Sequence, residues 1–111
     1  MGYIMNIAII RRFLKDDEIL AQMAEEASEL AQACLKLRRA IRGDNPTPVS
    51  TENAINDLTE EWADVMLCAD LLGKKYKPDH AAVDENMDYK AQRWADRLQG
   101  IKPLTEGGGK T

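Results

Sequence analysis

The sequence contains few cysteines, glycines, prolines and histidines, and each shortage excludes a class of protein. Its two cysteines, Cys34 and Cys68, are far apart, so they form neither a disulfide scaffold nor a zinc ribbon. Only seven glycines and four prolines occur among 111 residues, of which 44% are hydrophobic, and this excludes a disordered or collagen-like chain. The single histidine, His80, excludes the paired Glu-x-x-His motifs of diiron bundles.

Long hydrophobic runs and an excess of positive charge are also missing. The longest uncharged apolar run covers about ten residues, 1–10, whereas a membrane helix needs about 20. This run has no basic flank and no small-residue cleavage site, so we expect no signal peptide. The net charge of −4 disfavours binding to polymeric nucleic acid. Isolated cysteines are typical of a reducing compartment, so we expect a cytoplasmic protein with neither a membrane nor a nucleic-acid polymer as partner.

The pattern that is present is helical. In residues 19–41 an apolar stripe with spacings of four and three is formed by Met23, Ala27, Leu30, Cys34, Leu37 and Ile41. In residues 51–76 the same spacing joins Ile55, Leu58, Trp62, Val65, Ala69, Leu72 and Tyr76. A third long helix is expected to be capped by Asp79, and its apolar side, which we expect to face inward, is formed by Val83, Met87, Ala91, Trp94 and Leu98. We expect these stripes, with both tryptophans and both cysteines, to form the core.

Capping signals give the limits of the helices. Asp16 or Asp17 is expected to begin the first long helix, and Gly43 to end it. Ser50 or Thr51 is expected to cap the second, which follows a short loop and therefore pairs antiparallel with the first. Residues 4–14 are expected to form a further short helix. The sequence thus predicts one all-α domain of the antiparallel four-helix-bundle type over residues 1–100, and a flexible tail over 101–111.

Each of the two paired helices carries two carboxylates at positions i and i+3 beside its apolar stripe. They are Glu26 and Glu29 on the first helix and Glu61 and Asp64 on the second. Counting along both helices from the loop places all four within about one helical turn of the same height. Four carboxylates this close require either protonation or a cation among them. A ligand set made only of oxygen favours Mg²⁺, with Mn²⁺ as a substitute.

The third long helix supplies the opposite charge. Lys90, Arg93 and Arg97 lie on one flank of its apolar stripe, where they could neutralise the oxygens of a polyphosphate substrate. A plainer interpretation stays open for both groups. Glutamates on helix surfaces are usually solvated, and these cations could pair with Asp88 or Asp96.

The acidic pattern resembles that of the MazG-like all-α nucleoside triphosphate pyrophosphatases. The resemblance covers residues 20–98 and is carried by Glu25-Glu26-x-x-Glu29-Leu30 and Glu61-x-x-Asp64-Val65. It implies that Glu26, Glu29, Glu61 and Asp64 bind Mg²⁺ and that (d)NTPs are hydrolysed to the monophosphate and pyrophosphate. It also implies that Lys90 and Arg93 bind phosphate, and that a homodimer or homotetramer completes the helical bundle.

These observations lead to two hypotheses from different classes. The first is a Mg²⁺-dependent nucleotide pyrophosphohydrolase for housekeeping of the nucleotide pool. In it Glu26 or Glu29 orients or deprotonates the attacking water, and Lys90, Arg93 and Arg97 stabilise the departing pyrophosphate. The alternative is a non-catalytic helical dimerisation or adaptor module that retains the acidic motif.

Overall fold

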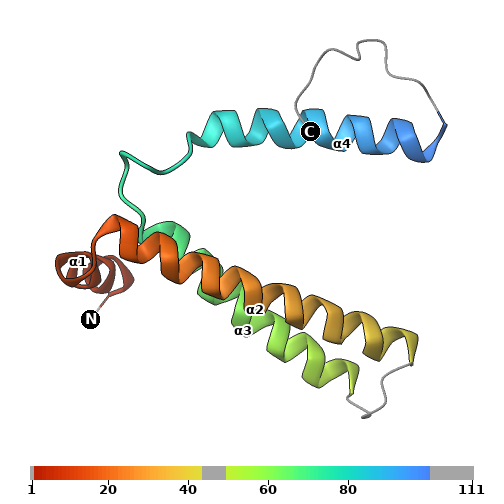
Figure 1. Cartoon of the computed structure of the whole chain (residues 1–111), viewed down its shortest axis with the longest axis horizontal. Helices are drawn as coiled ribbons and strands as arrows, with labels where there is room; N and C mark the ends of the chain where they lie inside the picture. Colours follow the sequence, from red (N-terminus) through yellow and green to blue (C-terminus); the bar gives the residue numbers. More distant parts are fainter. Residues whose placement is uncertain (1, 44–49, 101–111) are drawn as a thin grey trace. The chain divides into compact units, whose positions relative to one another are not determined.

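The protein is all-helical in the computed structural model, which describes residues 2–43 and 50–100 (Figure 1). The four helices in this part of the chain are α1 (Tyr3–Phe13), α2 (Asp16–Arg42), α3 (Thr51–Leu71) and α4 (His80–Leu98). The all-α prediction is therefore confirmed for these residues, and so is the short N-terminal helix. The predicted tail over residues 101–111 lies outside the described residues.

The chain comprises two compact units, Met1–Lys77 and Pro78–Thr111. Helices α1, α2 and α3 belong to the first unit, and α4 belongs to the second. The single bundle domain over residues 1–100 stays a prediction. In the described part of the chain, no helix combines the length and the apolar character needed to cross a membrane.

The ends of α3 and α4 follow from capping side chains. The Ser50 hydroxyl accepts a hydrogen bond from the Asn53 amide at 3.0 Å, and the Asp79 carboxylate accepts one from the Ala82 amide, also at 3.0 Å. Both acceptors satisfy an amide that has no partner within the helix. Gly43 ends α2 with φ of 72°, a left-handed conformation that glycine adopts without steric cost. These three capping predictions are confirmed.

One predicted helix limit was wrong, at the start of α2. Lys15, not an aspartate, is the N-cap of α2, and its backbone amide donates to the Glu18 carboxylate at 2.8 Å. Asp16 and Asp17 lie instead in the first turn, where their negative charge favours the N-terminal end of the helix dipole. At its far end α3 stops at Leu71, with Leu72 as its C-cap, directly before residues 73–78, where the cations and the proline predict its end.

Helices α2 and α3 lie side by side and run in opposite directions (Figure 1). At one end the Gly73 amide, just after α3, donates to the Asp16 carboxylate at 2.9 Å. Towards the other end Lys36 of α2 pairs with Asp57 of α3. The residue number rises along α2 while that of its partner falls along α3, as an antiparallel pair requires, so this prediction is confirmed.

A small apolar core holds α1, α2 and α3 together at one end of the pair. Ile19 of α2 is almost fully buried against Leu71 and Leu72, and Ile7 and Ile10 of α1 pack against this group. Further along the pair, Ala33 and Ala54 are buried, and their small side chains allow the two helices to approach closely. These contacts determine how each helix is rotated about its own axis.

The rotation differs from the one that the apolar stripes predicted. On α2 the side toward α3 is formed by Ile19, Met23, Glu26, Leu30, Ala33 and Leu37. On α3 the corresponding positions are Ala54, Asp57, Glu61, Asp64, Cys68 and Leu71. On both helices the buried set therefore includes carboxylates that had been expected only at the margin of an apolar stripe.

Several predicted core residues are consequently exposed. Trp62 is 58% exposed and Trp94 64% exposed, so neither tryptophan is a core residue within its unit. Cys34 is exposed as well, whereas Cys68 is buried as predicted. The helical period was correct for both helices. On α3 the predicted face is one residue away from the buried one, whereas on α2 the two sets share Met23, Leu30 and Leu37 and differ mainly because Glu26 and Ala33 take the places of Ala27 and Cys34.

Candidate metal centre

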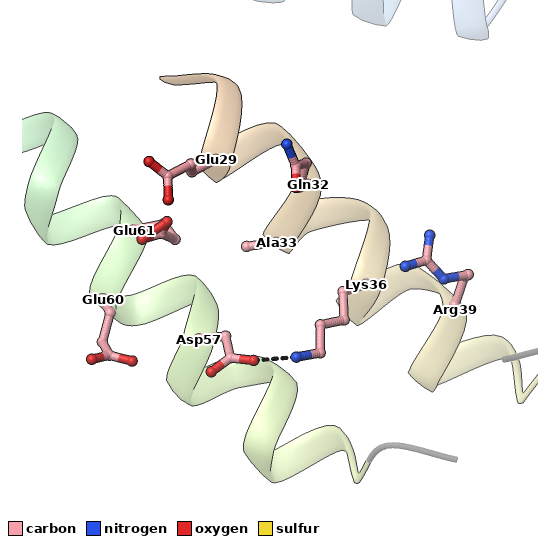
Figure 2. Close-up of a pocket in the computed structure, with 8 residues that line it drawn as sticks. All are labelled: Glu29, Gln32, Ala33, Lys36, Arg39, Asp57, Glu60 and Glu61. Atoms are coloured by element: carbon pink, nitrogen blue, oxygen red, sulfur yellow. Dashed lines mark hydrogen bonds and ion pairs between the residues drawn. The ribbon is translucent and has the colours of Figure 1, made fainter. Parts of the chain in front are cut away.

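Three of the four predicted carboxylates converge between α2 and α3. Glu26, Glu29 and Glu61 each offer an oxygen, and these oxygens all lie within 4.8 Å of one another. Glu26 and Glu29 are one helical turn apart on α2, and the antiparallel pairing brings Glu61 of α3 opposite them. Figure 2 shows Glu29 and Glu61 directed toward each other from the two helices. The convergence expected from sequence is therefore found for these three residues.

Asp64 lies one turn beyond Glu61 on α3 and is half-buried. It is outside the group of three, but its carboxylate is close enough to interact with the others. Its negative charge raises the pKa values of both Glu29 and Glu61. Asp64 therefore acts electrostatically on the same cluster.

The pKa values of Glu29 and Glu61 are both raised above the usual 4.5. For Glu29 the charge of Glu26 raises the pKa most, and desolvation comes second. For Glu61 desolvation raises the pKa most, followed by the charge of Glu29. Both effects disfavour the ionised form, and a cation among the carboxylates would oppose both. The cluster is thus poised to gain either a proton or a cation.

The neighbours of the cluster favour a hard cation. Gln22 donates a hydrogen bond to a Glu26 oxygen at 2.8 Å, which orients that carboxylate. Cys68 is buried, and the pKa of its thiol is raised first by burial and then by the charges of Glu26 and Asp64. The thiol therefore stays protonated at neutral pH and is a poor ligand. The available donors are oxygens, which suit Mg²⁺ or Mn²⁺ better than a softer metal.

The three cations predicted to bind substrate share one pocket on α4. Lys90, Arg93 and Arg97 line it together with Trp94, and its volume is about 210 Å³. The Arg93 guanidinium lies 5.6 Å from the centre of the Tyr89 ring, within the range of a cation–π contact. All four residues that line this pocket lie in the second unit.

Sequence reasoning missed a groove that adjoins the carboxylates. It has a volume of about 320 Å³, and besides Glu29 and Glu61 it is lined by Lys36 and Arg39 of α2 and Asp57 of α3. Figure 2 shows Lys36 reaching across to Asp57. A signal was present in the spacing, since Lys36 follows Glu29 by two helical turns and therefore shares its face.

A scan against protein-family models, a search of curated proteins and a search of solved structures each found no match.

Proposed function

We propose that the protein is a Mg²⁺-dependent nucleotide pyrophosphohydrolase that converts a (d)NTP into the (d)NMP and pyrophosphate. The observation that supports this most strongly is the meeting of Glu26, Glu29 and Glu61 within 4.8 Å on two antiparallel helices. These residues belong to both halves of the acidic motif that resembles the MazG-like pyrophosphatases.

In this proposal Glu26, Glu29, Glu61 and Asp64 hold the ion. Bound Mg²⁺ would neutralise charge on the phosphates and make a coordinated water more acidic. Glu26 or Glu29 then orients or deprotonates the water that attacks at the α–β phosphate linkage.

The proposal assigns Lys90, Arg93 and Arg97 to the phosphates of the substrate. They line one pocket, so several donors could act on a single anion, and charge-assisted hydrogen bonds to phosphate are strong. Their role would be to stabilise the charge that develops on the departing pyrophosphate.

We also propose that the protein acts as a homodimer or homotetramer in the cytoplasm, clearing unwanted nucleotides. An apolar hollow of about 390 Å³ on α3, lined by Ile55, Leu58 and Trp62, supports self-association. Large exposed apolar patches are typical of protein interfaces.

The direct test is pyrophosphate release from a panel of canonical, deoxy and damaged NTPs, with Mg²⁺ and with EDTA. We expect Mg²⁺-dependent release from at least one nucleotide, and its loss in Glu29→Gln and Asp64→Asn proteins that remain folded by circular dichroism. Full activity in either variant would contradict the proposed role of the cluster.

The exposed apolar hollow on α3 would equally serve a non-catalytic dimerisation or adaptor module. Thermal melting separates the two functions. A site that binds Mg²⁺ and a non-hydrolysable nucleotide raises the melting temperature when both are added. An unchanged melting temperature would favour the adaptor.

A further inference from the structure

The groove beside the carboxylates has two chemically different ends. Glu29 and Glu61 line one end, and Lys36 and Arg39 line the other. Along α2 the rise of the helix places the Cα of Lys36 about 10 Å, and that of Arg39 about 15 Å, from the Cα of Glu29. Lysine and arginine side chains are long enough to reach back over part of this distance. One small ligand could therefore contact both ends.

The two cations are available to a ligand in different ways. The Lys36 ammonium is held across the groove by Asp57, but this contact uses only one of its three donors. In the described part of the chain the Arg39 guanidinium has no ion pair, so its donor groups remain open. Asp57 thus holds the Lys36 ammonium in place, whereas the Arg39 side chain lines the same groove without an ion pair among the described residues.

The charge of the groove limits which ligand it accepts. Its lining carries four carboxylates, Glu29, Asp57, Glu60 and Glu61, against the two cations Lys36 and Arg39. A free anion would be repelled by this excess of negative charge, whereas one divalent cation at the acidic end would neutralise it. The arrangement favours an anion that arrives chelated to a metal ion.

We propose that Lys36 and Arg39 bind the outer phosphate of a diphosphate group whose other oxygens are held by a divalent cation at Glu26, Glu29 and Glu61. This inference rests on the proposed function for the cation at the carboxylates, and it adds a phosphate subsite on α2. The pyrophosphate part of a nucleoside triphosphate is the ligand class that fits, because it combines metal-chelating oxygens with a further charged phosphate.

Isothermal titration calorimetry with inorganic pyrophosphate, in saturating Mg²⁺, tests the subsite. We expect Arg39→Gln to weaken pyrophosphate binding by about tenfold, since a charge-assisted contact is lost. Lys36→Gln is expected to weaken it too, but it also leaves Asp57 without its partner. Arg38→Gln is the matched control, because Arg38 is exposed and lies outside the groove, and it should change the affinity less than about twofold.

Two further measurements complete the test. Mg²⁺ titrated alone should bind wild type and Arg39→Gln equally, which shows that the acidic end is intact. Without Mg²⁺, wild type should bind pyrophosphate too weakly to measure. Equal affinities for pyrophosphate in Arg39→Gln and wild type, or equal losses in Arg38→Gln and Arg39→Gln, would overturn the subsite.

The outcomes also separate this inference from the proposed function. If Arg39→Gln binds pyrophosphate normally while wild type hydrolyses a dNTP, the subsite is wrong and the enzyme stands. If Arg39→Gln loses affinity for pyrophosphate while no nucleotide is hydrolysed, the subsite stands and the proposed reaction is wrong.

Discussion

Over residues 55–64 of α3 the usual distribution of polar and apolar side chains between the two faces of a helix is reversed. The face toward α2 carries Asp57, Glu61 and Asp64, all half-buried. Away from it, Ile55 is 47% exposed and Trp62 58% exposed. An amphipathic helix normally turns its apolar stripe inward and its charges to solvent. On α3 the inner face therefore carries an excess of negative charge, and the outer face exposes apolar side chains.

A second contrast lies along the length of the pair. At the α1 end, Ile19, Leu71 and Leu72 form an ordinary apolar core, while the middle of the pair holds the carboxylate cluster. Burial of apolar side chains stabilises the folded protein at the α1 end. Repulsion between like charges destabilises it in the middle of the pair. Such a division is typical of a functional site supported by a scaffold.

The largest effect is expected from a substitution on the inner face of α3, the face toward α2. Glu61→Gln removes the charge that α3 contributes to the cluster, so we expect Mg²⁺-dependent pyrophosphate release to fall by about 10²- to 10³-fold. Glu52→Gln, on the exposed first turn of the same helix, is the matched control and should retain activity. Release assays on both proteins check this, and comparable losses in the two would contradict a specific role for Glu61.

The next largest effect is expected from a substitution on the outer, exposed face of α3. Trp62→Glu places a charge in the apolar hollow of α3, and we expect the dissociation constant for self-association to rise by about 30-fold or more, the size of an interface hot spot. Sedimentation velocity over a range of concentrations measures it. Asn56→Glu introduces the same charge outside the hollow and should leave assembly unchanged. A monomeric wild type would remove the basis of this prediction.

A smaller effect tests the close approach of the helices. Ala33 is 6% exposed, so Ala33→Leu overpacks the contact with α3 and should lower the free energy of unfolding by about 1–3 kcal/mol. Ala31→Leu adds the same side chain at an exposed position of α2 and should be nearly neutral. Urea unfolding of the two variants provides the comparison, and a stability for Ala33→Leu at or above that of Ala31→Leu would argue against close packing here.

The smallest effect concerns pH and metal. The pKa values of Glu29 and Glu61 are raised above 4.5 in the folded protein, so their protonated forms favour folding. This contribution is present at low pH and is lost as the pH rises through the raised values. In EDTA at pH 7, Glu29→Gln should therefore melt slightly above wild type, and the difference should shrink as the pH is lowered toward 4.5.

Added Mg²⁺ should reverse the order of the two melting temperatures at pH 7, because only wild type keeps the full ligand set. Differential scanning fluorimetry across this range checks both statements. If Glu29→Gln melted below wild type in EDTA at pH 7, repulsion within the cluster would be excluded as a cost to stability.

Much of the local structure could be predicted because it depends on neighbouring residues. The caps at Ser50 and Asp79 and the left-handed Gly43 follow from side-chain chemistry within one helical turn. The meeting of Glu26, Glu29 and Glu61 followed from helical spacing combined with a short connection between two helices. Asp64 interacts with this cluster but lies outside the group of three, which spacing alone did not distinguish.

Which side of α3 is buried against α2 could not be predicted in the same way. Ile55 and Trp62 form an apolar stripe at helical spacing that is as regular as the set from Ala54 to Leu71 that actually faces α2. Sequence spacing favours the more hydrophobic stripe, but the packing of α3 on α2 within the first unit places the other set toward α2. The groove with Lys36 and Arg39 was also missed, because the sequence analysis placed Lys36 on no particular face of its helix.

The amino-acid sequence by itself determined that the chain is helical, where most helices begin and end, and which carboxylates share a face, because these depend on contacts within a few residues. Only the tertiary structure decided how far α2 and α3 are rotated about their axes. That rotation depends on the packing of Ile19 against Leu71 and Leu72, residues far apart in the chain, and it turned the carboxylates inward and Trp62 outward.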